Sequence, residues 1–242
     1  MRDRTTSYNI ILNTIKQEWD KIGSYKISRF HSDYEVAEMN AITNTFGEEV
    51  THGCLFHYVK SLLLWIRKKT TLLWSMYEIK DEPESLIRKF IRQISALPLL
   101  PSVEKNRIWN IKLKKFTYLD DAGIPVDNIQ KEIMALIKYM ETQWLNQRGK
   151  RWDFNLLIRT RTTNAAESYY SSLRRDPLTP ASHPTIENFF NFLQQITSEI
   201  DSRIFKIANG LENPNPQNLI YKEIDERINQ ALNQYDVAYN LH

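Results

Sequence analysis

The stretch KISRFHSDYEVAEMNAITNTFGEEVTHGCLF, residues 26–56, decides the fold class of this chain. Apolar side chains at residues 26–31 and 50–56 predict two short strands, and residues 35–46 between them predict a helix that Gly47 ends. A helix between two strands is typical of an α/β unit. The stretch therefore predicts part of an α/β core, although two strands are too few to form a stable sheet alone.

Both flanks of this stretch are predicted to be helical. Before it, residues 5–22 carry apolar side chains at three- and four-residue spacing, and Gly23 follows as a helix C-cap. After it, helices are expected at residues 57–77, 83–97, 102–116, 127–146, 164–174, 185–208 and 219–241. The expected fold class is mixed α/β and predominantly helical.

Composition sets the broad class of the protein. Hydrophobic residues make up 42% and charged residues 25%, which permits a packed core, and only 6 glycines argue against a turn-rich all-β fold. The net charge of +3 permits nucleic-acid binding without requiring it. A single cysteine, Cys54, excludes an intrachain disulfide and favours a reducing compartment. The most apolar segment, residues 61–76, is too short and too charged to span a bilayer. A soluble, intracellular protein with no membrane partner is expected.

The first candidate site residue is Asp33, predicted to lie at the carboxyl edge of the first strand. Binding sites of open α/β sheets form at such edges. The alternative is a helix start, with Ser32 as the N-cap and Glu35 completing a capping box. Local sequence by itself favours the capping alternative.

The second candidate is the pair Cys54 and His57, three residues apart. Cysteine and histidine at this spacing can face one metal ion, but two ligands do not make a zinc site and no second cysteine occurs. We predict that both are local structural residues, a small buried thiol beside a histidine at a helix start.

The third candidate is Glu167 in the stretch RTRTTNAAES, residues 159–168. Asn164 can cap a helix here, with Glu167 as its capping-box partner. The capping interpretation is compatible with function, because a capped helix start holds a carboxylate rigidly.

In their order and spacing, these signals resemble the Mutator-like (MULE) transposase domain. The similar stretches are HSDYE (31–35), GCLFH (53–57), LPLLP (97–101), TNAAES (163–168) and PTIE (184–187). The resemblance covers most of residues 5–205. Each motif is weak by itself, and their combination is fairly specific.

The resemblance implies an RNase H-like DDE transposase fold in which three acidic residues bind Mg²⁺ or Mn²⁺ and DNA is the substrate. Asp33 matches the second acid and Glu167 the third, so both would be catalytic and metal-binding. The first acid of the family lies upstream of the helix that begins here near Thr5, so we expect a catalytically incomplete fragment. A nuclear location is also implied, and homo-oligomerisation stays open.

The same resemblance suggests four segments. Residues 1–57 would form a partial RNase H-like core, residues 58–147 an all-helical insertion, residues 148–210 the return to the core with the third acid, and residues 211–242 a helical tail.

A basic region precedes and follows the third motif. Its candidate DNA-binding residues are Arg148, Lys150, Arg151, Arg159, Arg161, Arg174 and Arg175, interleaved with Trp152, Phe154, Tyr169 and Tyr170. Arginine pairs with phosphate oxygens, and aromatic rings stack on exposed bases. The alternative is a solvated, charged surface. The separate run Arg67-Lys68-Lys69 is interpreted as a solvated helix face.

Three functions are compatible with these observations. The first is a MULE transposase-derived protein that binds DNA. The second is a domesticated DNA-binding or transcription-regulating protein that reuses the fold. The third is a helical interaction scaffold without a nucleic-acid role. Salt-sensitive DNA binding separates the first two from the third.

Overall fold

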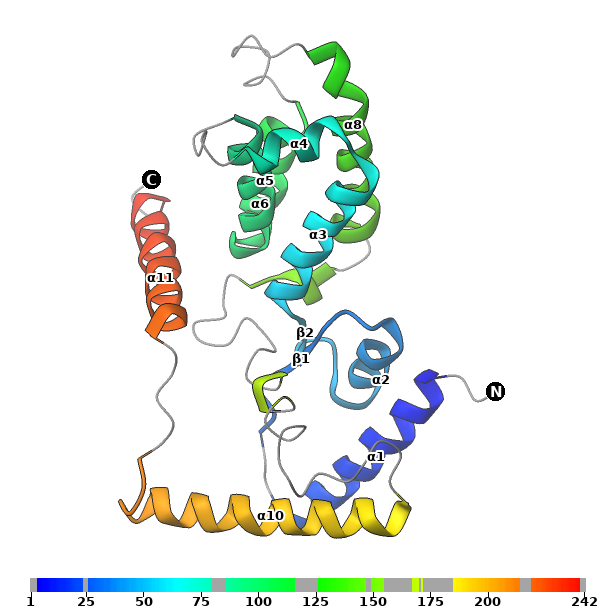
Figure 1. The fold of residues 1–242 in the computed structure, drawn as a ribbon, viewed down its shortest axis with the longest axis vertical. Helices are drawn as coiled ribbons and strands as arrows, with labels where there is room; N and C mark the ends of the chain where they lie inside the picture. The colour runs from blue at the N-terminus through cyan, green and yellow to red at the C-terminus, as the bar shows by residue number, and fades with distance from the viewer. Residues whose placement is uncertain are drawn as a thin grey trace. The chain divides into compact units, whose positions relative to one another are not determined.

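The computed structural model describes residues 4–23, 26–79, 86–115, 126–146, 149–154, 167–169, 171, 185–213 and 219–239. The chain divides into two compact units, Met1–Thr163 and Asn164–His242. The described residues are mostly helical and include one two-stranded parallel sheet (Figure 1). The expected predominantly helical, mixed α/β class is thereby confirmed.

The sheet and its connecting helix form a β–α–β unit. Strands β1 (Phe30–Ser32) and β2 (Thr51–Gly53) are parallel, and helix α2 (Val36–Phe46) connects them. Parallel neighbouring strands need such a crossover connection, because a tight turn between them would make them antiparallel. Helix α1 (Arg4–Ile22) packs against α2, where the rings of Trp19 and Phe46 lie 6.1 Å apart.

Both strands are shorter than predicted. The second ends at Gly53, because Cys54 is already the N-cap residue of helix α3 (Leu55–Lys69). The Ser32–Glu35 capping box is wrong: α2 begins after Glu35, and the hydroxyl of Ser32 instead donates to Glu38 at 2.5 Å. Asp33 is thus left in the bend between β1 and α2.

The long middle of the first unit is helical. It contains α3, α4 (Leu72–Glu78), α5 (Leu86–Ala96), the 3₁₀ turn η1 (Leu97–Leu99), α6 (Ser102–Ile108), η2 (Trp109–Leu113), α8 (Val126–Met140), η3 (Glu141–Leu145) and the 3₁₀ turn η4 (Gly149–Trp152). Where one helix was predicted at 57–77, the structure has two, α3 and α4, with Thr70 and Thr71 between them.

Glu132 explains that break. Its carboxylate accepts the backbone N–H groups of Thr71 at 2.8 Å and Leu73 at 2.8 Å, and also that of Leu72 at 3.2 Å. These backbone N–H groups are donors that the first turn of a helix leaves without partners inside the helix. The side chain of Glu132, from α8, therefore caps the N-terminus of α4. Burial raises the pKa of Glu132, but the three backbone hydrogen bonds outweigh it and lower the pKa below its usual value of 4.5.

We expect Glu132→Ala to lower the free energy of unfolding by about 1 kcal/mol, the usual cost of losing a helix cap. A carboxyl pKa lowered in the folded state stabilises the fold above pH 4.5, and this contribution disappears as the pH falls through the folded-state pKa. Urea unfolding at pH 7 and at about pH 3 measures both effects. The exposed neighbour Gln130→Ala is the control, and an equal loss in both variants would contradict the capping role.

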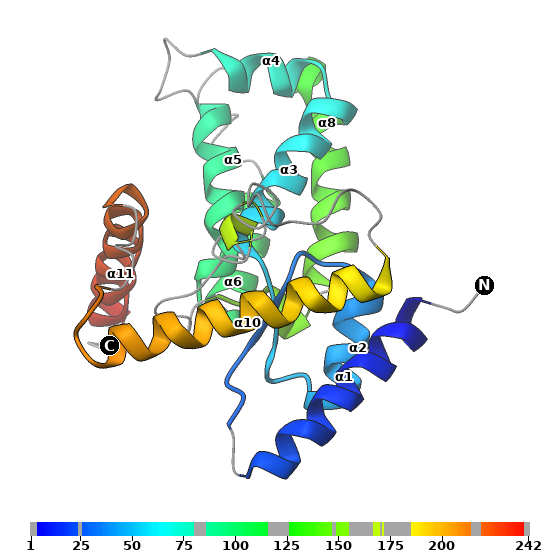
Figure 2. The same ribbon diagram turned by 60° about the horizontal axis from the view of Figure 1, so that its bottom comes forward.

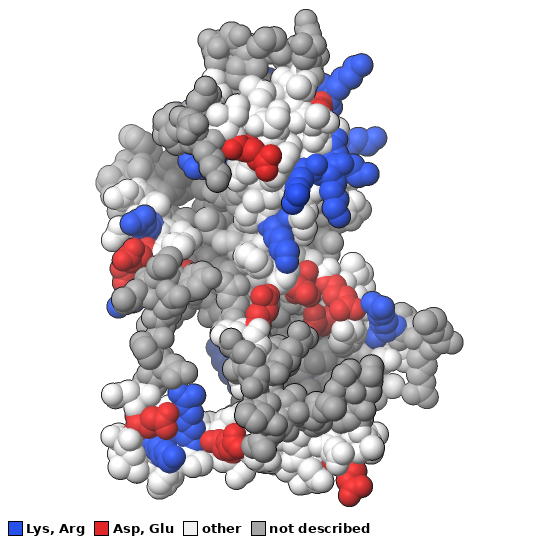
Figure 3. Space-filling model, in the orientation of Figure 1, with Lys and Arg blue, Asp and Glu red and all other residues white. Residues whose placement is uncertain are grey.

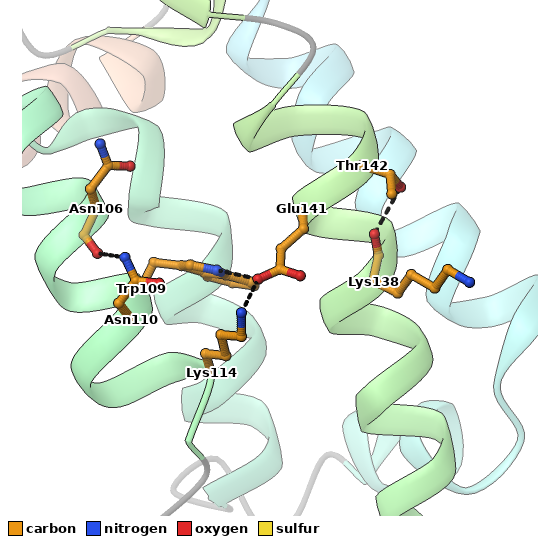
Figure 4. Close-up of polar contacts among 7 residues, drawn as sticks. All are labelled: Asn106, Trp109, Asn110, Lys114, Lys138, Glu141 and Thr142. Atoms are coloured by element: carbon orange, nitrogen blue, oxygen red, sulfur yellow. Dashed lines mark hydrogen bonds and ion pairs between the residues drawn. The ribbon is translucent and has the colours of Figure 1, made fainter.

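The last turns of two helices widen into π-helix. In η2 the N–H of Lys114 donates to the carbonyl of Trp109 at 2.8 Å, and in η3 the N–H of Asn146 donates to that of Glu141 at 3.0 Å. The two π segments contact each other (Figure 4), because Glu141 accepts from Trp109 Nε1 at 3.4 Å and pairs with Lys114 at 2.6 Å. Such irregular turns are rare and are stabilised here by side chains from both helices.

An aromatic cluster joins the β–α–β unit to the helical segment. It consists of Tyr34, Tyr58, Trp144 and Trp152, all buried. The ring of Trp144 lies 4.9 Å from Tyr34, 4.7 Å from Tyr58 and 6.0 Å from Trp152, the first two contacts being edge-to-face. Edge-to-face contacts at these distances are favourable for aromatic rings. The sheet edge and the helices therefore share one core.

The ring of Tyr34 also limits which side chain fits at position 53. Its backbone has φ of 71°, which is uncommon for a residue with a side chain, and this turns the ring onto β2. A Cβ added at Gly53 would overlap the ring of Tyr34. Glycine at position 53 is thus needed for space.

The second unit contains two long helices, α10 (Ile186–Ala208) and α11 (Leu219–Tyr239). The hydroxyl of Thr185 accepts the N–H of Asn188 at 3.2 Å and so caps α10. No residue of α10 is buried, and its exposed apolar side chains include Phe189, Phe190 and Phe205. Among the described residues, no helix has the length and apolar character that crossing a membrane requires.

Candidate functional site

Asp33 lies directly after β1, at the carboxyl end of the parallel strand pair. Its side chain is exposed, and Glu35 and Glu38 follow at the N-cap and in the first turn of α2. Burial raises the pKa of Glu38, the hydrogen bond from Ser32 lowers it, and the charges of Asp33 and Glu35 raise it further. The negative charge of Asp33 therefore acts on its neighbours at this edge of the sheet.

Glu35, unlike Asp33, is held by contacts from α1. The hydroxyl of Tyr8 donates to its carboxylate at 3.1 Å, and Arg4 lies 3.6 Å away. Burial and this hydrogen bond both raise the pKa of Tyr8. Glu35 thus ties α1 to the start of α2, which leaves Asp33 as the exposed carboxylate at the strand end.

Two histidines face each other across the sheet, a pair that sequence reasoning missed. His31 and His52 occupy matching positions on β1 and β2, and their rings lie 6.0 Å apart. Nδ1 of His31 lies 3.3 Å from the carbonyl of Gly53, which can only accept, so this nitrogen is the donor. Only the parallel register brings the two rings together, and no spacing along the chain indicates it.

Both histidines favour the neutral form. Burial lowers the pKa of His31, and the bond to Gly53 only partly opposes this. Burial also lowers the pKa of His52, and the neighbouring charges of His31 and Arg29 lower it further. Both values lie below the ordinary histidine pKa of 6.5.

We therefore expect the folded state to lose stability as the pH falls below about 6.5. In this range the histidines bind protons in the unfolded chain but stay neutral in the folded chain. The loss of unfolding free energy therefore begins at the unfolded-state pKa and continues down to the folded-state pKa. Urea unfolding between about pH 8 and pH 5 measures it. In the double variant His31→Gln/His52→Gln this part of the pH dependence should vanish.

The carboxyl of Glu38 contributes in the opposite direction, because its raised pKa favours the folded state at low pH. Glu38 is present in both the parent and the double variant, so its contribution cancels when their pH dependences are compared. A double variant that keeps the full pH dependence of the parent would contradict the assignment to the two histidines.

Glu167, the other predicted acid, lies in the second unit. It is exposed, within a helical turn at residues 167–169. Asp33 belongs to the first unit, so the predicted approach of the two carboxylates stays a prediction.

Carboxylate oxygens suit Mg²⁺ and Mn²⁺, so Asp33 is a suitable donor. Within the part of the chain that the structure describes, however, no three His, Cys, Asp or Glu side chains gather in a way that could hold a metal ion. Cys54 is fully buried at the start of α3, and His57 follows one turn later against the ring of Phe56. Their predicted structural role stays a prediction.

The predicted DNA-binding region is described only in part. Arg148, Arg159, Arg161, Arg174 and Arg175 lie outside the described residues, and Lys150 belongs to η4. Arg151 contacts α2 with its guanidinium, donating to Asn40 at 3.3 Å and to Thr43 at 2.9 Å. Arg151 therefore has a structural role, since it fastens η4 to the β–α–β unit.

The interpretation of Trp152 and Phe154 as base-stacking aromatics is wrong. Trp152 is 1% exposed and Phe154 fully buried, so neither ring can reach a nucleotide. Trp152 belongs to the aromatic cluster, and the N–H of Phe154 donates to the carbonyl of Pro98 at 2.9 Å. Both residues bring the chain back to the core after the helical segment.

Asp33 is the predicted site residue whose surroundings the structure describes most fully. It lies at the strand edge where sites form in α/β proteins. The chain matches no family model, no curated protein and no solved structure.

Proposed function

We propose that the chain is part of the catalytic domain of a Mutator-like transposase and that it binds DNA. Its RNase H-like core would be interrupted by the helical segment α3 to η3. One observation carries the proposal: Asp33 lies at the carboxyl end of β1 in a parallel β1–α2–β2 unit that a helical segment follows directly. This is the order of elements that the sequence motifs imply.

The resemblance would make Asp33 and Glu167 ligands of Mg²⁺ or Mn²⁺. Such ions activate the attacking oxygen and stabilise the leaving oxygen in phosphodiester transfer. One feature supports Asp33: it is exposed, whereas the neighbouring Glu35 is bonded by Tyr8 and Arg4. A domesticated protein that only binds DNA would share the fold without needing this pair of acids.

Metal titration tests the role of the two acids. Mn²⁺ affinity, measured by calorimetry or electron paramagnetic resonance, is expected to fall about tenfold or more in Asp33→Asn and in Glu167→Gln. The control is Glu48→Gln, because Glu48 is exposed and lies before β2, at the opposite end of the strand pair. An unchanged Mn²⁺ affinity in both acid variants, or an equal loss in the control, would contradict the pair.

DNA binding tests the wider proposal. The purified chain is expected to bind duplex DNA with an affinity that falls steeply as salt rises, because each phosphate contact adds about 0.9 to the slope of log K against log salt. Fluorescence anisotropy with a labelled duplex at several salt concentrations measures this slope. A chain that binds no DNA even at low salt would remove the transposase proposal and favour an interaction scaffold.

A further inference from the structure

Six cations lie on two neighbouring helices of the helical segment, and together they are called the basic face. They are Lys60, Arg67, Lys68 and Lys69 on α3 and Lys131 and Lys138 on α8. All six are exposed, and within the described residues none forms a salt bridge. Figure 3 shows Lys and Arg side chains gathered over this part of the molecule.

The two helices hold these cations in a fixed arrangement. Helices α3 and α8 lie side by side in both ribbon views (Figures 1 and 2), and the rings of Trp65 and Tyr139 stack between them at 4.6 Å. The buried residues of α3 and α8 belong to the same core cluster. The basic face is therefore built on packed helices, which fix the spacing of the backbone positions that carry its charges.

Two acids on the same helices have other partners. Glu132 is committed to the backbone N–H groups at the start of α4. Glu141 is committed to Lys114 and Trp109, whose hydrogen bonds lower its pKa even though burial opposes them. Lys138 points away from Glu141 (Figure 4). The positive potential of the six cations thus reaches the solvent.

We propose that the basic face binds the phosphate backbone of duplex DNA, as a contact surface additional to the predicted region around residues 148–175. From Lys60 to Lys68 the helix rises by about 12 Å. Phosphates follow one another every 3.4 Å along each strand, so this length faces about three of them. The proposal rests on the proposed function, because that function makes DNA the polyanion concerned.

Lysine favours DNA over an acidic protein as the partner. Protein–protein interfaces are depleted of lysine and need apolar or aromatic anchors at their centre. Five of the six cations are lysines, which act as point charges toward phosphate oxygens. Contacts of this kind position the duplex and carry no sequence information. Binding at the basic face is therefore independent of sequence.

The test compares two charge-matched variants of the full chain. One replaces Lys68, Lys69, Lys131 and Lys138 of the basic face with glutamine. The control replaces four other exposed cations of the helical segment, Lys89, Arg92, Lys112 and Lys115, with glutamine. Circular dichroism and thermal unfolding establish that both are folded. Anisotropy then measures affinity for two duplexes of unrelated sequence between about 50 and 200 mM salt.

The basic-face variant is expected to lose at least tenfold in affinity for both duplexes at about 100 mM salt. The slope of log K against log salt should shrink by about 2–4, and the control should keep most of the parental slope. Wild-type affinity and slope in the basic-face variant, or equal losses in the control, would overturn the proposal while leaving the proposed function intact. Anisotropy with labelled polyglutamate, a model acidic polypeptide, completes the test: a basic-face variant that loses polyglutamate binding but keeps its DNA binding would overturn the proposal in favour of an acidic protein. A wild-type chain that binds no DNA at all would overturn both proposals together.

Discussion

Replacing Trp144 with alanine is expected to lower the free energy of unfolding of the first unit by about 3–5 kcal/mol. The side chain is 3% exposed and contacts the rings of Tyr34, Tyr58 and Trp152. Its removal opens a cavity where the sheet edge and the helices meet, and the surrounding rings cannot collapse into it without losing their own contacts. Urea unfolding followed by far-ultraviolet circular dichroism measures the loss.

Trp74→Ala serves as the control for this variant. Trp74 is half-buried, and its ring contacts are with Tyr77 and Arg67 at the edge of α4. Its replacement removes a similar side chain from the margin of the core, where solvent can fill the space, so we expect a loss of about 1 kcal/mol. Equal losses in both variants would show that the aromatic cluster is not the structural centre of the unit.

The second large effect is expected for Gly53→Ala. The added methyl group would overlap the ring of Tyr34, which cannot swing away because Trp144 covers it edge-on. Overpacking of a tight core costs about 1–3 kcal/mol and sometimes more. The change in unfolding free energy, measured in urea at pH 7, gives the size of this cost.

A double variant separates lack of space from every other cause. In a Tyr34→Ala background the ring is gone, so Gly53→Ala should be neutral or should stabilise the fold by about 0.5 kcal/mol, because alanine restricts the unfolded chain. The backbone at Gly53 is not in the left-handed region, in contrast to Gly23 with φ of 113°. If Gly53→Ala costs the same with and without the ring, the steric explanation is wrong.

Local patterns predicted the elements but not all of their ends. Apolar spacing located α1, α2 and α10 to within a few residues of their observed bounds. The break between α3 and α4 depends on Glu132, which lies far along the chain, so no local signal for it exists. The π turns η2 and η3 likewise depend on contacts between two helices.

The candidate site was predictable only where the position of a residue depends on the neighbouring sequence. Asp33 was expected at the end of a strand, and it lies there. Trp152 and Phe154 looked like partners for bases because they stand among arginines, whereas tertiary packing places them in the core. The basic face depends on two helices coming together, so the sequence showed only the run on α3 and interpreted it as solvated.

The docking of η4 beside β2 has a consequence for the order of folding. Strands β1 and β2 can pair after a short loop closes, but Trp152 and Phe154 reach the core only when the whole helical segment has brought the chain back. Closing that longer loop costs more conformational entropy, and the contacts that compensate for this cost form only after the loop has closed. The β–α–β unit and the helices should therefore gain protection against hydrogen exchange before the amide of Phe154 does. Residues 149–154 would then act as the latch that completes the native state.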